Sequence, residues 1–225
     1  MCNRYRPASV TFIRDTFGFT LIEESYAAEI GPLQQGPFVM RERALVGQWG
    51  LIPPGSRTRK PTRADGKPIS TNNCRRESVA SAWSFRGPWA RGQRCLIPAL
   101  DYDEPYWGTG KNIWWRFGRA DGQLWALAGV WSEWADPLSG ELVPSYTMLT
   151  QNCDADPFLS QFHKPDPALP AQQQDKRSVV PIEREHWDQW LNGSIRDAEA
   201  LIRLPARELF RHGAADPSQA VPLPA

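Results

Sequence analysis

Residues 112–131 read NIWWRFGRADGQLWALAGVW, and this stretch decides the fold class. Apolar and aromatic residues fill its two halves, Asn112–Phe117 and Gln123–Trp131, as is typical of β-strands. Between the halves stands Asp121-Gly122, a dipeptide that favours the tight turn of a β-hairpin. The stretch therefore predicts two antiparallel strands joined by a hairpin.

More strands and a few helices are expected around this hairpin. Because strands fill the middle of the chain and helices its ends, we expect an α+β fold: a strongly curved or barrel-like mixed β-sheet with peripheral helices. We expect one domain over residues 1–212 and a Pro/Ala-rich C-terminal tail over 213–225. The further expected strands are one entered from a turn within 31–40, Ala44–Ile52, Arg94–Leu100, Ser145–Gln151 and Arg177–Ile182, and the expected helices are Ser9–Phe17, Asp154–Gln161, Glu183–Leu191 and Ser194–Leu204.

Charge and hydropathy narrow the class of protein. The net charge is +1, from 26 basic and 25 acidic residues, whereas a protein that grips long duplex DNA by charge is usually more basic. A short nucleic-acid contact lined by local arginines is compatible with this balance. No apolar run approaches 18 residues and no apolar leader follows a charged start, so we expect no membrane span, no secretory signal and a cytoplasmic location.

The four cysteines are Cys2, Cys74, Cys95 and Cys153. None forms a CxxC pair or stands at a metal-like spacing from a histidine, so neither a zinc site nor a disulfide framework is expected. Cys74, Cys95 and Cys153 have mixed or apolar neighbours and are expected to be buried, inert thiols.

Cys2, unlike the other three cysteines, could be chemically reactive. If Met1 is removed, Cys2 carries a thiol and a free α-amine on adjacent carbons. The amine can form a Schiff base with an aldehyde, and the thiol can then add to the imine to close a five-membered thiazolidine. Ring closure is intramolecular and gains from a high effective molarity. The alternative is that Cys2 is an ordinary residue at a frayed terminus.

Five segments, in order, resemble one family. The segments are Met1–Tyr5 (MCNRY), Gln48–Pro53 (QWGLIP), Asn73–Glu77 (NCRRE), Arg94–Ala99 (RCLIPA) with Glu104 five residues later, and Phe162–Pro165 (FHKP) followed by Asp175–Val180 (DKRSVV). Together they are similar to the SRAP family, the SOS-response-associated peptidases regarded as abasic-site processing proteins, and the similarity runs from residue 1 to about residue 190.

The resemblance implies a catalytic pocket in which Cys2 meets Asn73, Glu104 and His163. Asn73 would donate to the sugar oxygen or hold the N-terminal amine. Glu104 would take up and return protons, at a pKa raised towards neutrality if its apolar neighbours bury it. His163 would act as an acid or base near its ordinary pKa of about 6.5.

The resemblance also implies a substrate and a partner. Members of the family bind single-stranded DNA, link covalently to the ring-opened aldehyde of an abasic site and remove their own leading methionine. We therefore expect single-stranded DNA with abasic sites as the partner of a monomer that needs no cofactor and no metal, located at the nucleoid when bound to DNA. Whether Met1 leaves by self-cleavage or through an aminopeptidase stays open.

Four residues are expected to bind DNA. Arg4 and Arg75 match arginines that contact phosphate in the family, since a guanidinium can bind a phosphate through two donors. Arg76 lies beside Arg75, and Trp49 either stacks on a base or belongs to the core. For each arginine a surface salt bridge is the alternative. The loop Pro53–Asn72, rich in arginine and lysine, is expected to lie on the surface.

The chain departs from the family pattern in several places. Asn3 replaces a common glycine, and Asp101–Pro105 (DYDEP) replaces GFYEW. Asp103 is expected to point away from Glu104, because successive strand residues face opposite sides. Pro167–Gln174 lengthens the segment after His163, and the expected asparagine-and-proline segment is not recognisable in 31–37.

Two other functions fit the same residues. An N-terminal-nucleophile cysteine hydrolase would use Cys2, Asn73 and His163, with the amine of Cys2 as its base. A non-catalytic module for single-stranded nucleic acid would keep its affinity without Cys2. Formation of a stable adduct with an aldehyde separates the thiazolidine chemistry from both.

Overall fold

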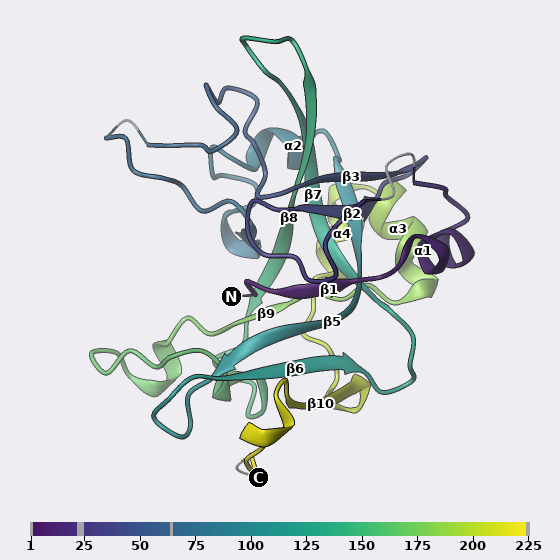
Figure 1. The fold of residues 1–225 in the computed structure, drawn as a ribbon. Helices are drawn as coiled ribbons and strands as arrows, with labels where there is room; N and C mark the ends of the chain where they lie inside the picture. The colour runs from purple at the N-terminus through teal and green to yellow at the C-terminus, as the bar shows by residue number, and fades with distance from the viewer. Residues whose placement is uncertain (1, 22–24, 64, 224–225) are drawn as a thin grey trace.

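The computed structural model describes residues 2–21, 25–63 and 65–223, and its centre is a closed five-stranded β-barrel (Figure 1). Neighbouring barrel strands run antiparallel, except that β3 and β8 are parallel. This confirms the predicted α+β fold with a barrel-like mixed sheet. In their order around the barrel, the strands are β2 (Gln35–Val39), β3 (Ala44–Trp49), β8 (Leu142–Asn152), β7 (Trp125–Ala135) and β5 (Arg94–Tyr106).

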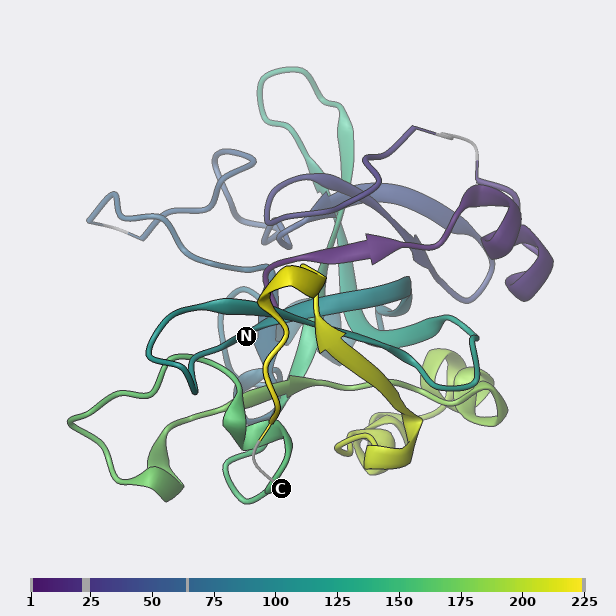
Figure 2. The same ribbon diagram turned by 60° about the horizontal axis from the view of Figure 1, so that its bottom comes forward.

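Further strands extend the sheet outside the barrel. β5 is longer than the expected Arg94–Leu100, because its first half pairs with β7 and its second half with β6 on one side and β1 on the other. β10 lies beside β6 (Figure 2), and β4 and β9 both pair with β8. These outer strands are β1 (Tyr5–Pro7), β4 (Asn73–Arg75), β6 (Ile113–Arg119), β9 (Arg177–Val179) and β10 (Phe210–Ala214).

The expected hairpin joins β6 and β7. Gly122 has φ +74°, a left-handed conformation that costs glycine little. The Asp121 carboxylate accepts bonds from the backbone N–H of Gln123 and from the Arg119 guanidinium, and the latter lowers the pKa of Asp121 to about 2. The turn is therefore fixed by its own side chains.

Within the described residues, four short α-helices cover the barrel. The helix expected over Ser9–Phe17 forms with Ser9 as its N-cap, and Ser194 caps α4 in a reciprocal capping box with Asp197. The helix expected over Asp154–Gln161 is wrong: only a 3₁₀ turn forms there, because the Asp156 carboxylate accepts from two backbone N–H groups and holds a turn. The helices are α1 (Val10–Phe17), α2 (Arg86–Ala90), α3 (Trp187–Asn192) and α4 (Ile195–Leu201), and the 3₁₀ turns are Arg76–Ser78, Leu159–Gln161, Ala171–Gln173, Arg184–His186, Arg207–Leu209 and Pro217–Gln219.

The core has two main clusters. One includes Cys2 and Trp49 and continues into the aromatic layer between β5, β6 and β10. The other packs helix side chains such as Ile13 and Trp190 against the barrel. Cys74, Cys95 and Cys153 are free and buried, as expected.

The C-terminal segment after Phe210 folds back on the domain. Gly213 and Ala214 are the last residues of β10, and Val221 and Leu223 pack against the cluster that contains Cys2. The last two residues of the expected tail lie outside the described residues. Among the residues that the structure describes, no helix is both long and apolar enough to span a membrane.

Candidate active site around Cys2

The pairing of β1 with β5 positions Cys2. Tyr5 lies opposite Tyr102, and the Asp103 N–H donates to the Arg4 carbonyl at 3.0 Å. Because the two strands run antiparallel, this register carries Cys2 towards Glu104. Cys2 is fully buried, and its Sγ donates to the Arg4 carbonyl at 3.4 Å.

The environment of Cys2 keeps its thiol protonated. Burial raises the pKa of the Cys2 thiol well above its ordinary value, and the nearby Glu104 carboxyl raises it further. A buried thiol of this kind is a poor nucleophile until a base removes its proton. Cys2 therefore differs from the ionised thiolate of a cysteine protease.

Two asparagines hold the backbone of Cys2. Asn73, the first residue of β4, donates from Nδ2 to the Cys2 carbonyl at 2.7 Å. Asn72, which the sequence analysis missed although it adjoins Asn73, donates from Nδ2 to the Asn3 side chain at 3.1 Å and contacts the Cys2 carbonyl at 3.5 Å. Asn73 Oδ1 is buried and has no hydrogen-bond partner within the described part of the chain, so it can accept one more donor.

Glu104 is a buried carboxyl next to these groups. Burial raises its pKa from 4.5 to about 7, in the direction that its apolar neighbours predicted, and the negative charge of Asp103 adds to the rise. Glu104 therefore changes its protonation state near neutral pH, unlike an exposed glutamate. Such a group can both donate and accept a proton without a large change in pH.

His163 faces Glu104 from the segment after β8. Its Nε2 lies 3.5 Å from Glu104 Oε2 and 2.9 Å from the Arg177 carbonyl oxygen. A carbonyl can only accept, so this contact favours the neutral imidazole with its proton on Nε2. Burial lowers the pKa of His163 to about 3, well below the value of about 6.5 expected from the sequence.

The backbone at His163 is held in an uncommon conformation. Its φ is +69°, which is rare for a residue with a Cβ and is retained only where the surroundings enforce it. The His163 N–H donates to the Pro105 carbonyl at 2.6 Å, and Lys176 Nζ donates to the His163 carbonyl at 2.6 Å. Lys176 lies in the DKRSVV segment, but the sequence assigned it no role.

The three arginines expected at DNA all have protein partners. Arg4 donates from Nε and Nη2 to Asp103 at 2.9 and 2.7 Å and stacks on Trp114. Arg75 pairs with Asp175 at 2.6 Å, and Arg76 donates to Gln151 and to the Ile202 carbonyl, each at 3.3 Å. A phosphate at any of them would have to compete with these contacts.

Trp49 is a core residue. It is fully buried, its Nε1 donates to the Asn72 carbonyl at 2.8 Å, and its ring packs edge-on against Tyr5. Its ring is therefore not open to a base, which corrects the expectation that it binds DNA. Its indole instead supports the Asn72–Asn73 segment that holds Cys2.

An ion-pair ladder beside the site was not expected from the sequence. As predicted, Asp103 points away from Glu104: its carboxylate accepts from Arg4 and from Arg116. Asp101 pairs with Arg6 and lies 3.4 Å from Arg116, so the three arginines and two aspartates alternate across β1, β5 and β6. Both aspartates are departures from the family pattern.

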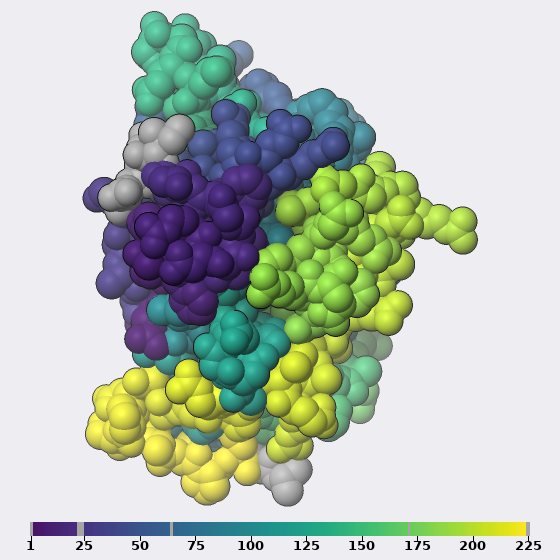
Figure 3. Space-filling view, turned by 90° about the vertical axis from the view of Figure 1, so that its right-hand side faces the viewer, coloured from purple at the N-terminus to yellow at the C-terminus, as the bar shows by residue number. Residues whose placement is uncertain are grey.

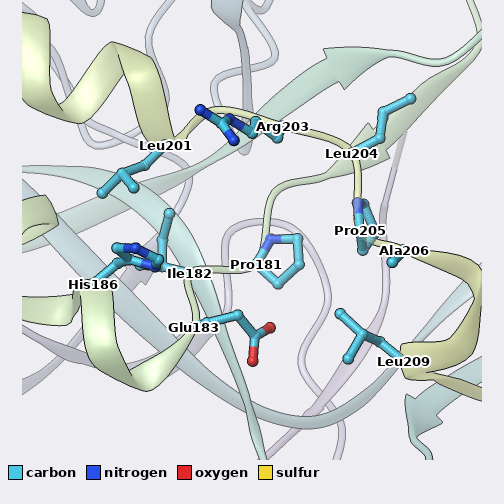
Figure 4. Close-up of a pocket in the computed structure, with 10 residues that line it drawn as sticks. All are labelled: Pro181, Ile182, Glu183, His186, Leu201, Arg203, Leu204, Pro205, Ala206 and Leu209. Atoms are coloured by element: carbon cyan, nitrogen blue, oxygen red, sulfur yellow. The ribbon is translucent and has the colours of Figure 1, made fainter.

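Two hollows, one near Cys2 and one far from it, differ in volume and in lining. A cavity of about 10 Å³ lies against Glu104 and His163, too small for a sugar. A hollow of about 230 Å³ between β9, α4 and the 3₁₀ turn Arg207–Leu209 is lined mainly by apolar side chains (Figure 4). It contains none of the expected site residues. No cluster that could hold a metal ion occurs among the described His, Cys, Asp and Glu residues.

Comparison with known proteins identifies the family. A family model described as SOS response associated peptidase (SRAP) matches residues 1–214. An abasic site processing protein HMCES from Gallus gallus is 28% identical over 218 residues, covering 81% of this chain and 59% of that protein. The HMCES of Pongo abelii is 27% identical over 148 residues, covering 54% of this chain and 40% of that protein. The chain thus spans less than two thirds of the length of these relatives.

Solved structures agree on the fold. A crystal structure of a Bordetella bronchiseptica protein is 32% identical, has a TM-score of 0.83, and covers 99% of this chain and 100% of that one. A Bacteroides thetaiotaomicron protein, 17% identical with a TM-score of 0.76, covers 96% of this chain and 93% of that one and supports the fold alone. The match to the family model over nearly the whole chain shows that this protein belongs to the SRAP family.

Proposed function

We propose that this protein acts in the DNA damage response by capturing abasic sites in single-stranded DNA. After loss of Met1, the α-amine and thiol of Cys2 would form a thiazolidine with the ring-opened aldehyde of the abasic sugar. The observation that carries the proposal is the placing of a buried Cys2 beside Asn73 and Glu104, with His163 next to Glu104. The names of the HMCES relatives support the choice of substrate.

The proposed reaction needs proton transfer but no oxidant or metal. The neutral amine adds to the aldehyde carbon, and loss of one water gives the imine. The thiol then adds to the imine carbon, and the thiol proton ends on the nitrogen. Glu104, with a pKa of about 7, can protonate the leaving oxygen as the acid and remove the thiol proton as the carboxylate.

The neighbours of Glu104 have positioning roles in this scheme. Neutral His163 donates to the Arg177 carbonyl, and its uncharged ring lies beside the Glu104 carboxyl. Asn73 fixes the Cys2 carbonyl and offers its unpaired Oδ1 to a hydroxyl of the opened sugar. Both would align the amine with the aldehyde and so raise the effective concentration of the reacting atoms.

Met1 decides whether the site can react. Met1 lies outside the described residues, so its removal stays a prediction. Because Cys2 is fully buried, we propose that loss of the preceding residue both frees the amine and opens the approach to it. Removal of Met1 by the protein itself would be the autopeptidase activity that the family name describes. We further propose that it works as a cytoplasmic monomer.

The test is an intact-mass spectrum before and after incubation with a single-stranded oligonucleotide that carries one abasic site. We expect loss of Met1, followed by a gain of one oligonucleotide mass less one water. Undamaged DNA and a tetrahydrofuran abasic analogue, which lacks an aldehyde, should give no adduct. Cys2→Ala should abolish the denaturant-stable adduct.

The alternatives give different spectra. An adduct that survives in Cys2→Ala would show that another group reacts and would overturn the mechanism. Loss of Met1 without any adduct, together with turnover of an amide, would favour the hydrolase. DNA affinity that is unchanged in Cys2→Ala, with Met1 retained and no adduct in the wild type, would favour the binding module.

A further inference from the structure

A second large hollow lies on the face of the barrel that Figure 3 shows. Its volume of about 530 Å³ falls within the range of roughly 300–1,000 Å³ typical of small-molecule sites. Four segments line it: the β2–β3 turn, the α2–β5 connection, Trp131 of β7 and the C-terminal end of α3. In Figure 3 the β2–β3 region is dark blue and the α3 region is yellow-green.

This hollow is separate from the candidate active site. Arg94, the first residue of β5, lines it, whereas Glu104 is ten residues further along the same strand. At about 3.3 Å per residue, the two positions are roughly 30 Å apart along the strand. Figure 1 shows the same separation, with the N-terminus on the left of the barrel and α3 on the right.

The lining of the hollow is strongly basic in a protein of net charge +1. Arg41, Arg43, Arg91 and Arg94 line it, and Glu42 is its one acidic residue. Arg43 pairs with Glu133 at 3.1 Å. Across the described part of the chain, no carboxylate oxygen lies within 4.0 Å of the guanidinium groups of the other three arginines. The hollow therefore gathers positive charge that the protein does not neutralise.

Arg94 is the most buried of these positive charges, because it is only 4% exposed. Its Nε and Nη2 donate to the carbonyls of Trp190 and Gly193 at the end of α3, which fixes the guanidinium. Burial lowers the pKa of Arg94, and the exposed Asp197 of α4 offsets this shift only in part. A buried cation with carbonyl partners alone is costly, and a bound anion would offset that cost.

Trp131 adds an aromatic wall to these cations. The residue is half-buried, and part of its side chain packs against the core cluster that contains Cys2 while it lines the hollow. An arginine cluster favours phosphate, and an indole offers a flat face on which a base can stack. The two features together match a nucleotide better than a simple anion.

We propose that this hollow binds a nucleoside phosphate, with the phosphate on Arg41, Arg91 and Arg94 and the base against Trp131. The ligand is either a free mononucleotide or one nucleotide of a nucleic-acid strand, since both carry the same chemistry. The site works without Cys2 and does not depend on the proposed thiazolidine reaction.

The test is isothermal titration of the full-length protein with thymidine 5′-monophosphate, inorganic phosphate and thymidine. We expect the mononucleotide to bind at least tenfold more tightly than inorganic phosphate, and thymidine not to bind. The Arg41→Glu/Arg91→Glu variant should weaken binding of the mononucleotide at least tenfold. The control Arg14→Glu/Arg203→Glu makes the same charge change at exposed arginines outside the hollow and should bind as the wild type does.

A second variant and a competition experiment complete the test. If the glutamate variant does not give a native melting curve, Arg41→Gln/Arg91→Gln replaces it. A 5′-phosphorylated undamaged oligothymidine that displaces the mononucleotide identifies a strand as the source, and failure to displace it identifies a free nucleotide. The proposal is overturned if thymidine 5′-monophosphate does not bind at millimolar concentration, or if the control pair loses as much affinity as the Arg41/Arg91 pair.

Discussion

Burial shifts the pKa values of Cys2, Glu104 and His163 in different directions. In water these side chains would ionise over the range of about pH 4 to 9. In the folded protein the pKa of the Cys2 thiol rises, that of Glu104 rises to about 7, and that of His163 falls to about 3. Glu104 is then the group of the three that changes charge near neutral pH. The proton transfers of the proposed reaction therefore rest on one carboxyl.

The raised pKa of Glu104 makes stability depend on pH. The unfolded carboxyl loses its proton near pH 4.5, but the folded one keeps it until about pH 7, so the folded state binds more protons between these values. This contribution to stability is full below pH 4.5 and is lost as the pH rises to about 7. The shift corresponds to roughly 3 kcal/mol. Glu104→Gln should therefore gain up to about 3 kcal/mol over the wild type between pH 4 and pH 8.

Urea unfolding of both proteins at pH 4, 6 and 8 measures this difference. The control Glu208→Gln, at an exposed side chain, should stay within about 0.5 kcal/mol of the wild type at each pH. Glu104→Gln should also slow adduct formation at neutral pH, because glutamine cannot carry the proton. A stability difference for Glu104→Gln that is the same at pH 4 and pH 8 would show that Glu104 ionises as an exposed carboxyl does.

At the scale of elements, β1 must stay on β5 for Cys2 to reach Glu104. β1 has only three residues, so few backbone bonds hold it. The ladder of arginines and aspartates compensates, because Asp103 accepts from Arg4 of β1 and from Arg116 of β6. The ladder thus ties the strand that carries Cys2 to its two neighbours in the sheet.

Asp103→Asn tests this role of the ladder. The carboxylate of Asp103 is 2% exposed and faces two arginines that are 30% and 25% exposed at the side chain, so solvent screens the pair only in part. We expect a loss of about 1–3 kcal/mol in urea unfolding. Adduct formation should also slow, because β1 is less firmly held.

Glu141→Gln provides the matched control. Glu141 pairs with Arg59 at 2.7 Å, but both side chains are about half exposed, and such pairs contribute about 0–1 kcal/mol. This variant should form the adduct at the wild-type rate. Equal stability losses in the two variants would mean that the Asp103 contacts are no stronger than an ordinary surface pair.

The same elements show what the sequence could and could not predict. The barrel strands and the helices α1, α3 and α4 were predictable, because the β-hairpin signal of Asp121-Gly122 and the spacing of apolar residues are local signals. Motif order alone indicated Cys2, Asn73, Glu104 and His163, and the structure brings them together. The ladder and the pKa of His163 were not predictable, because they depend on strand register and on burial between segments that are separate in the sequence. Trp49 was ambiguous for the same reason, since burial decides its role.

At the scale of the whole molecule, the barrel closes where β3 meets β8. This is its parallel pair, and it runs over only two residues on each strand, Gln48 and Trp49 against Ser145 and Tyr146. The closure carries Trp49, which supports Asn72, to the neighbourhood of Cys2. The candidate active site therefore depends on a short seam between β3 and β8.

Gly47, which precedes this seam, shows how closely the strands approach. A Cβ at Gly47 would lie 2.7 Å from the Pro144 carbonyl oxygen of β8 and 2.8 Å from the Phe38 ring. The backbone oxygen can move only with its strand, so Gly47→Ala should force β3 and β8 apart and cost about 1–3 kcal/mol in urea unfolding. Because the seam positions Trp49 and through it Asn72 and Asn73, adduct formation should slow as well. Gly213→Ala is the matched control, since a Cβ there meets no atom within 4 Å, and it should change stability by less than about 0.5 kcal/mol. If Gly47→Ala is as stable and reactive as Gly213→Ala, then β3 and β8 accommodate the methyl group without loss of stability. The site would then not depend on closure of the barrel.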